Sequence, residues 1–279
     1  MSANPEVIYN RILEAIASNK LPLPSKPDIV SALQEVATNP DIEVNDLFEI
    51  ISQDPALTAR LLRLANSPLV RGKVAVNNLE TAISRMGVHF VSNLATGLAL
   101  EQLFKTDNPL IAKRMEEAWQ MSTQVAAVCS VITAHLSKLP SDQAMLGGLL
   151  HEIGTLSILS YAEKNLELLE DPELLDQLIA NHTTKLSEDI MTAWQFPAAL
   201  SNLPKALNQY YENKDKPDLA DTLLIAKIDV IRNNPNHPLN ELNKEELPCY
   251  NRLNLDPGKT LDEYPELAND LAAAKEIFK

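Results

Sequence analysis

The sequence predicts an all-α fold, and three observations support this prediction. Apolar residues recur every three or four positions along nearly the whole chain, as they do on the buried face of a helix. No stretch of five or more residues alternates convincingly between apolar and polar side chains, which is the pattern of a half-buried strand. Glycine, which weakens helix interiors, occurs only seven times in 279 residues. We therefore expect helices that bury a large core.

The first three helices are predicted from proline positions and apolar spacing. Asn4 and Pro5 begin the first helix, because proline fits the first turn of a helix. Two prolines in the segment 21–24 then break it, since proline inside a helix removes a backbone hydrogen bond. The next two helices are marked by apolar residues in 29–37 and 44–51.

The fourth and fifth helices carry capping signals. Asp54 and Pro55 provide a side-chain acceptor and a fixed φ at the start of the fourth helix, which stops at 66–68. Asn78 is expected to cap the fifth helix in the same way. Gly87 is expected to end it, because glycine accepts the left-handed conformation that often follows a helix.

The remaining helical patterns lead up to an abrupt change of composition. They run over 88–104, 109–137, 141–153, 173–192, 197–212 and 218–233. Beyond them the chain is polar and rich in proline, and apolar periodicity returns only near Leu267 and Leu271. We expect an N-terminal helical subdomain over 1–105, a helical bundle over 106–235, and a C-terminal appendage over 236–279. The appendage should wrap the main body and end in one short amphipathic helix; a partner-binding tail is the alternative.

The charge of the chain excludes several function classes. A net charge of −14 repels phosphates, so we expect neither nucleic acid nor an anionic membrane as a partner. The two helices in 78–98 faintly resemble a helix-turn-helix, but few basic residues accompany them, so a hairpin packed on the body is expected. No apolar run reaches the ~18 residues of a membrane span, and the N-terminus does not read as a signal peptide. The cytoplasm is the expected compartment.

The cysteines and glycines indicate no cofactor site. Cys129 lies in an apolar run and is expected in the core, and with Cys249 it forms no CxxC pair. This argues against zinc on cysteine, and a disulfide between the two has no support. The glycines follow neither the Walker nor the GxGxxG spacing that binds nucleotide phosphates. We therefore predict no cofactor.

Six segments, in order along the chain, resemble the HDOD family. They are LPSKP at 23–27, DPALT at 54–58, LLRLANS at 61–67, LETAISRMG at 79–87, GLLHEIG at 148–154 and WQFP at 194–197. The resemblance implies an all-α fold related to HD-type metal-dependent phosphohydrolases, and a role in bacterial signal transduction rather than catalysis. It also implies regulatory proteins as partners, such as those of two-component or cyclic-dinucleotide pathways.

The resemblance allows the metal site of the HD enzymes to be compared one ligand at a time. In those enzymes a His, an adjacent His-Asp pair and a later Asp hold the metal that activates a water. The His-Asp pair aligns with His151 and Glu152, which remain able to bind a cation. The first His aligns with Met121, whose thioether is a poor ligand for hard metals. The last Asp aligns with Lys227, whose ammonium repels a divalent cation.

Nearby residues do not replace the missing ligands. His135 follows Met121 on the same predicted helix at a distance of ~21 Å along the axis. Asp229 is displaced by ~200° of helix rotation from Lys227 and faces away. We therefore expect no metal and no catalysis at this site, and we hypothesise that Lys227 forms an ion pair with Glu152 that fills it.

Structural explanations compete with functional ones at several residues. His151 lies on an apolar helix, which is typical of a hydrogen-bonded core histidine. His182 is expected to help cap a helix near Thr183 or Thr184. The family often has a histidine at this position, so a supporting role beside the HD pocket is the alternative. Trp194 and Phe196 are expected to form a packed corner between helices.

The prediction for the site and for the function follows from these comparisons. The vestigial HD pocket comprises Met121, His151, Glu152, Lys227 and His182. The expected function is non-catalytic signal output through protein–protein contacts. The alternatives are a metal-dependent phosphohydrolase acting on a nucleotide or phosphoester, and a sensor that binds a small molecule in the vestigial pocket.

Overall fold

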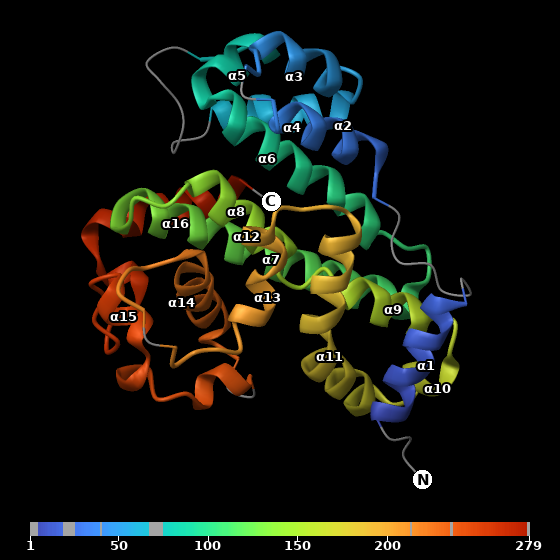
Figure 1. Ribbon diagram of the computed structural model, residues 1–279. Helices are drawn as coiled ribbons and strands as arrows, with labels where there is room; N and C mark the ends of the chain where they lie inside the picture. The colour runs from blue at the N-terminus through green and yellow to red at the C-terminus, as the bar shows by residue number, and fades with distance from the viewer. Residues whose placement is uncertain are drawn as a thin grey trace.

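The computed structural model of the protein describes residues 5–18, 26–39, 41–66, 75–212, 214–234 and 237–277. Within these ranges the regular structure is helical and contains no strand, which confirms the predicted all-α fold (Figure 1). None of the described helices is long and apolar enough to cross a membrane.

Five helices form an N-terminal lobe at the top of Figure 1. They are α2 (Asp28–Ala37), α3 (Val44–Ile51), α4 (Pro55–Ala65), α5 (Leu79–Met86) and α6 (Val88–Ala99). The predicted caps are confirmed: Asp54 accepts two backbone hydrogen bonds from the first turn of α4, and Asn78 accepts one from the first turn of α5. Gly87 ends α5 with a φ of 88°, a conformation that favours glycine.

The rest of the fold is built on α7 (Pro109–Leu136), a helix of 28 residues. Helix α8 (Ser141–Leu150) approaches α7 so closely that a Cβ added to Gly148 would lie 2.5 Å from the Cα of Ala126. A side chain at position 148 would therefore force the two helices apart. Helix α14 (Leu219–Ile231) packs against both α7 and α8 and is buried over most of its surface.

Five further helices lie between α8 and α14. They are α9 (Thr155–Glu163), α10 (Leu166–Leu169), α11 (Pro172–Ala193), α12 (Ala198–Ser201) and α13 (Leu203–Ala206). Trp194 is the C-terminal cap of α11, and Phe196 follows two residues later. Both side chains are buried and their ring centroids are 6.4 Å apart, which confirms the predicted packed corner.

Three predicted helices differ from the structure in extent. The helix predicted over 88–104 continues beyond α6 as the 3-10 helix η1 (Leu100–Phe104). The helix predicted over 141–153 ends before His151. Apolar residues flank His151 and Glu152 on both sides, in α8 and from Ile153 into α9, so apolar spacing alone does not mark the break. The helix predicted over 197–212 consists of α12 and α13, because Pro204 lacks the N–H that a continuous helix needs there.

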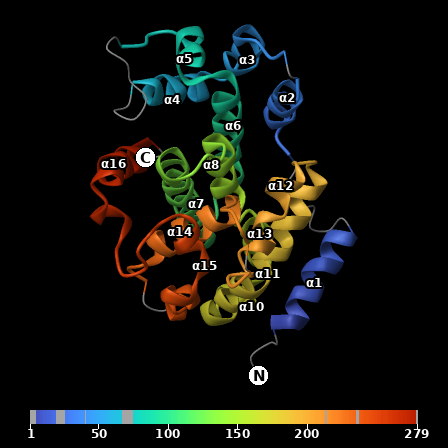
Figure 2. The ribbon, with the colours of Figure 1, turned by 60° about the vertical axis from the view of Figure 1, so that its left-hand side comes forward.

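Helix α1 (Pro5–Ala17) packs on α11 and α9 (Figures 1 and 2). The ring of Tyr9 stacks on that of His182 with a centroid distance of 3.8 Å and an interplanar angle of 8°. The predicted start of α1 at Asn4 and the predicted linker at 21–24 lie outside the described residues.

The C-terminal segment packs against α7 and α14 of the main body. It contains η2 (Pro238–Glu241), η3 (Lys244–Glu246), α15 (Pro248–Arg252), η4 (Leu261–Glu263) and α16 (Pro265–Ile277). Helix α16 packs along α7 and buries Leu267, Leu271 and Ala274 (Figure 2). His135 of α7 lies 2.8 Å from Asp270 of α16, so it contributes to this contact and not to the HD pocket.

Both cysteines are buried and free, and Cys129 lies in the core, as predicted. Burial raises the pKa of both thiols, that of Cys249 to about 12. Neither side chain therefore forms a reactive thiolate near neutral pH.

An ion pair between Arg252 and Asp221 holds the C-terminal segment to α14. The guanidinium donates to both carboxylate oxygens, at 2.7 and 2.5 Å, and the two side chains are 8% and 6% exposed. Removing one partner leaves the other charge buried without compensation, which costs far more than the loss of a surface ion pair.

We expect the substitution Arg252→Ala to lower the free energy of unfolding by about 3 to 5 kcal/mol, because Asp221 loses its buried partner. Urea denaturation followed by circular dichroism measures the change. The matched control is Arg114→Ala, which breaks a contact with the exposed Asp176 and should cost at most about 1 kcal/mol. Equal losses in the two variants would contradict this account.

Candidate functional site

The candidate site lies where α8 ends and faces α14. His151 is the C-terminal cap of α8, and it is followed by a tight turn that leads into α9. Its side chain is buried, with 2% of the residue exposed. The ring Nδ1 lies 2.7 Å from the carbonyl oxygen of Gly148, so Nδ1 carries the proton and donates it to that oxygen. This hydrogen bond leaves Nε2 as a bare acceptor.

The Nε2 atom of His151 has no hydrogen-bond partner within the part of the chain that the structure describes. The carboxylate of Glu152 lies near it, at 3.9 Å. Burial lowers the pKa of His151 to about 4, because the protonated ring would lose its hydration, and the opposing effect of Glu152 is smaller. His151 is therefore neutral near neutral pH, as expected for a hydrogen-bonded core histidine.

Glu152 forms the ion pair with Lys227 that the sequence predicted. The lysine Nζ donates to a carboxylate oxygen at 2.5 Å, and the lysine and glutamate side chains are 12% and 24% exposed. Burial, the largest single effect, would raise the pKa of Glu152, but the charge and the hydrogen bond of Lys227, together with smaller effects of His151 and His237, lower it to about 2. The carboxylate is thus charged and engaged, and it links the turn after α8 to α14.

A second histidine, His237, lies beside this ion pair. His237 precedes η2, and its Nδ1 accepts a hydrogen bond from the backbone of Leu239 at 3.2 Å. Burial lowers its pKa, and the charge of Lys227 lowers it further, whereas Glu152 opposes both effects. Nothing in its proline- and asparagine-rich sequence segment indicates that this side chain folds back onto the ion pair.

The other two predicted pocket residues lie on α7 and α11. Met121 is half-buried against the core on α7. His182 lies in the middle of α11, so the expectation that it caps a helix is wrong: α11 continues without a break through that position. Its ring contacts α1, where it stacks on Tyr9 and its Nε2 lies 3.7 Å from Glu6.

The residues at this site do not fit a divalent metal ion. In the described ranges, no three His, Cys, Asp or Glu side chains come together in a way that could hold one. The carboxylate of Glu152 is held by an ammonium, and His151 offers one ring nitrogen. A catalytic metal needs about three protein ligands and an open position.

The neutral state of His151 predicts a pH dependence of stability. Its pKa is about 4 in the folded protein against 6.5 for an ordinary histidine, so the unfolded chain takes up the proton first as the pH falls. The contribution of neutral His151 to the free energy of unfolding is complete above pH 6.5. It is lost as the pH falls from that value to about pH 4.

We therefore expect the unfolding free energy of the wild type to fall by about 2 to 3 kcal/mol more than that of His151→Gln between pH 7 and pH 4.5. Urea denaturation at the two pH values measures this difference. The control is His89→Gln, which alters an exposed residue of α6 and should behave as the wild type. A His151→Gln variant with the acid sensitivity of the wild type would show that His151 is not buried as a neutral ring.

Comparison with known proteins places the chain in a family. A family model for the HDOD domain matches residues 23–210, which include His151 and Glu152 and end before α14. An uncharacterized protein of Treponema pallidum (strain Nichols) is 23% identical over 221 residues, which are 72% of this chain and 42% of that protein. The chain thus spans less than half the length of this relative.

Several crystal structures share the fold. One, of a candidate metal-dependent phosphohydrolase from Shewanella amazonensis SB2B, is 25% identical, covers 99% of both chains and gives a TM-score of 0.84. An HDOD domain protein of unknown function from Geobacter sulfurreducens is 17% identical, with 97% of this chain and 99% of that chain covered and a TM-score of 0.66. A candidate signal transduction protein from Marinobacter aquaeolei VT8 is 20% identical, with 99% and 67% covered and a TM-score of 0.65. The match over two thirds of the chain and the shared all-α fold lead to one conclusion: the chain belongs to the HDOD domain family.

Proposed function

We propose that this chain is a regulatory module that acts through contacts with other proteins and does not catalyse a reaction at its HD-related site. The observation that carries the proposal is the ion pair at 2.5 Å between Lys227 and Glu152. The family resemblance implies that both positions carry carboxylates in the HD-type enzymes, and that these carboxylates hold a metal. Here one of them is an ammonium that neutralises the other.

The charges at this site oppose a divalent cation. A cation that bound Glu152 would have to displace Lys227 or lie within a few ångströms of its ammonium, and the repulsion at that distance is worth several kcal/mol at a low effective dielectric. Met121 stands at the position of the first histidine ligand, and its thioether binds hard cations poorly. The remaining acceptor, Nε2 of His151, is a single nitrogen that cannot hold a metal alone.

The same ion pair supports a structural role for the former metal site. It joins the turn after α8 to α14, two elements that are 75 residues apart in the chain. A metal bound at this place would join them as well. We infer that the ion pair keeps the two elements together without a cofactor, so the fold remains available as a platform for partners.

The partners that we propose are regulatory proteins, such as those of two-component or cyclic-dinucleotide pathways. The expectation rests on membership of the HDOD family. The fold shared with the candidate signal transduction protein of Marinobacter aquaeolei VT8 is compatible with it. Affinity capture of the full chain followed by crosslinking should identify such a protein, and the substitution His151→Ala should leave its binding unchanged.

A metal-dependent phosphohydrolase is the second candidate function. The observation in its favour is that the Shewanella amazonensis SB2B protein, which shares 25% identity over nearly the whole chain, is named as a candidate enzyme of this kind. The ligand set of the present chain argues against it. The two functions differ in whether the protein binds a transition metal and cleaves a phosphoester.

We expect the purified protein to hydrolyse bis(p-nitrophenyl) phosphate in the presence of Mn²⁺ no faster than the buffer does, because the site cannot hold the metal that activates water. Release of nitrophenolate measures the rate. Turnover that depends on Mn²⁺ and disappears in His151→Ala would overturn the proposal.

A variant with a repaired site provides the positive control. Met121→His, Glu152→Asp and Lys227→Asp together restore the ligand types of the HD enzymes, and isothermal titration calorimetry should show Mn²⁺ binding more than about tenfold tighter than in the wild type. The matched control, Met121→Leu with Lys227→Met, removes the ammonium without adding ligands and should not gain this affinity.

A further inference from the structure

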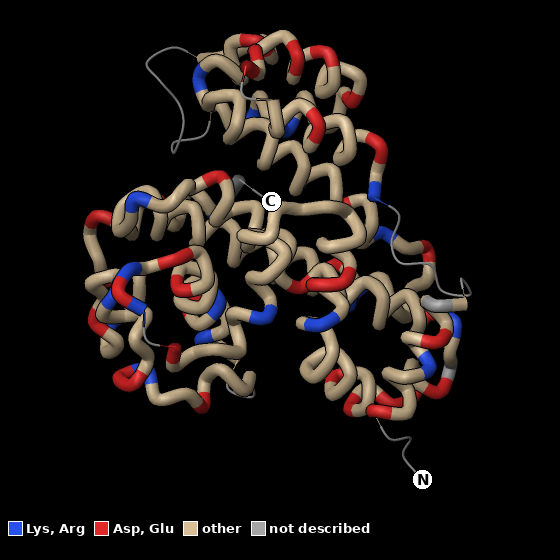
Figure 3. The backbone as a smooth tube through the Cα atoms, viewed as in Figure 1, with Lys and Arg blue, Asp and Glu red and all other residues tan. Residues whose placement is uncertain are grey.

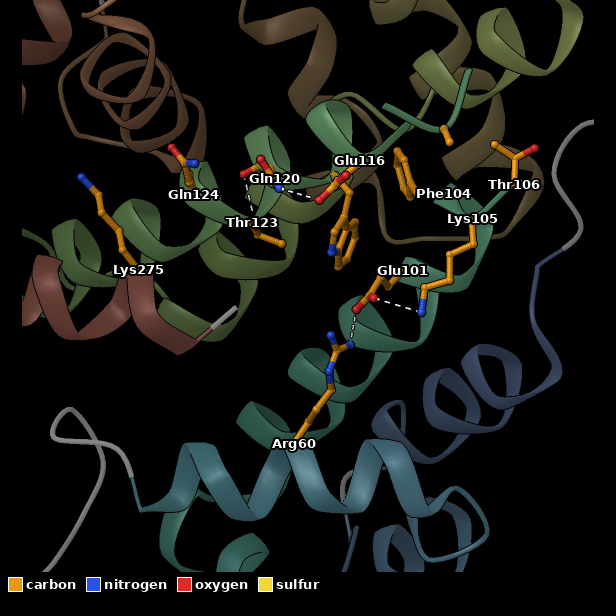
Figure 4. A pocket seen from close by; sticks show the side chains of 12 residues that line it. Arg60, Glu101, Phe104, Lys105, Thr106, Glu116, Gln120, Thr123, Gln124 and Lys275 are labelled. Carbon is orange, nitrogen blue, oxygen red and sulfur yellow. Dashed lines mark hydrogen bonds and ion pairs between the residues drawn. The ribbon is translucent and has the colours of Figure 1, made fainter. Parts of the chain in front are cut away.

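A crevice lies between the N-terminal lobe and α7, and the ion pair of Glu152 and Lys227 does not line it. It is bounded by Arg60 of α4, by η1 with the residues that follow it, by α7, and by Lys275 of α16 (Figure 4). Its volume is about 860 Å³, within the range of sites that bind small molecules. Such sites commonly lie where two parts of a fold meet.

One wall of the crevice is aromatic. The rings of Trp119 on α7 and Phe104 on η1 lie with their centroids 5.3 Å apart and their planes at 42°. Both residues are buried, so their rings are held in place by the core. Trp119 and Phe104 are 8% and 5% exposed, so only a small part of each ring reaches the crevice, where it offers a fixed apolar contact to the ring of a ligand.

Polar groups of α7 lie next to this wall. Gln120, Thr123 and Gln124 line the crevice from successive turns of the helix (Figure 4). The amide of Gln120 donates to Glu116 at 3.1 Å, and both amides can donate to or accept from a ligand. The crevice thus combines an apolar surface with a few hydrogen-bonding groups, as ligand sites do.

The charges of the crevice favour an anion. Glu101 lies between Arg60, with which it forms an ion pair, and the ammonium of Lys105 at 3.2 Å. Burial would raise the pKa of Glu101, but hydrogen bonds and charges from the two cations lower it, so the carboxylate stays ionised. Two cations thus share one carboxylate and retain one uncompensated positive charge.

The whole lining is positive although the chain is strongly acidic. It holds three cationic side chains against two carboxylates, in a chain of net charge −14 whose acidic residues are spread over all its parts (Figure 3). The third cation, Lys275, lies 3.7 Å from Asp229, and Arg232 contacts the same carboxylate at 3.3 Å, so Lys275 shares its counterion with a second cation. A small anion is therefore attracted to this crevice more than to the surrounding surface.

We propose that the crevice binds a small organic anion that carries a planar ring. The ring packs against Trp119, and the negative charge lies near Lys105 and Arg60. Nucleoside monophosphates and aromatic carboxylates share this chemistry. This site goes beyond the regulatory function proposed above. A ligand bound there contacts both the N-terminal lobe and α7, so its binding is an input signal for the module.

The test uses Trp119 as its own reporter. The chain has two tryptophans, so Trp194→Phe leaves one indole, which lines the crevice. The probes are AMP and salicylate, which combine a ring with an anion, together with adenosine as the ring alone and inorganic phosphate as the anion alone. Calorimetry on the wild-type protein repeats each titration, in case the tryptophan variant folds poorly.

We expect saturable quenching of Trp119 by AMP or by salicylate, with an affinity at least about tenfold higher than that for adenosine and for phosphate. Binding of AMP alone identifies a nucleotide site, and binding of salicylate alone identifies a site for aromatic acids. The proposal is overturned if neither probe binds the wild-type protein at concentrations up to about 10 mM.

A pair of lysine variants tests the place of binding. Lys105→Gln should weaken the binding of the successful probe about tenfold, because the anion loses one of its two cations. Lys113→Gln is the matched control: Lys113 lies outside the crevice on α7 and contacts Glu117 at the surface, so its loss should leave the affinity unchanged. Equal effects of the two variants would mean that the probe responds to net charge alone, which contradicts a built site.

Discussion

The backbone contact between α8 and α7 is the constraint on which the rest of the structure depends. At Gly148 the two helices lie too close for any side chain, so the register of α8 on α7 is fixed there. Three residues later, His151 caps α8, and its ring Nδ1–H donates a hydrogen bond to the carbonyl oxygen of Gly148. That register sets the direction of the Glu152 side chain, and so allows its contact with Lys227.

Two ion pairs join α14 to distant parts of the chain. Lys227 binds the turn after α8, and Asp221 binds Arg252 of the C-terminal segment. Most of the remaining surface of α14 is apolar and buried, so these ion pairs, with that of Asp229 and Lys275, orient the helix while the apolar contacts supply most of the stabilisation. The C-terminal segment is therefore integrated with the main body. The fold shared with the structure from Shewanella amazonensis SB2B extends over 99% of the chain and so includes this segment.

Sequence analysis predicted the elements whose causes are local, and it failed where the cause is distant. The caps at Asp54 and Asn78 act within one turn of their own helices, so their residue types are sufficient evidence. The turn at His151 lies between two apolar stretches, so apolar spacing alone does not mark it. The contact of Glu152 with Lys227 was predictable because the family resemblance paired the two positions, whereas no comparable signal links His237 to them.

The two cysteines have a consequence for labelling chemistry. Each is buried, and its raised pKa keeps it protonated, so maleimides and other thiol reagents have no reactive native target in the folded protein. A single cysteine introduced on α4 and another on α16 would carry a spectroscopic dye pair without background. Changes in the distance between the N-terminal lobe and α16 could then be followed by energy transfer in the otherwise unaltered chain.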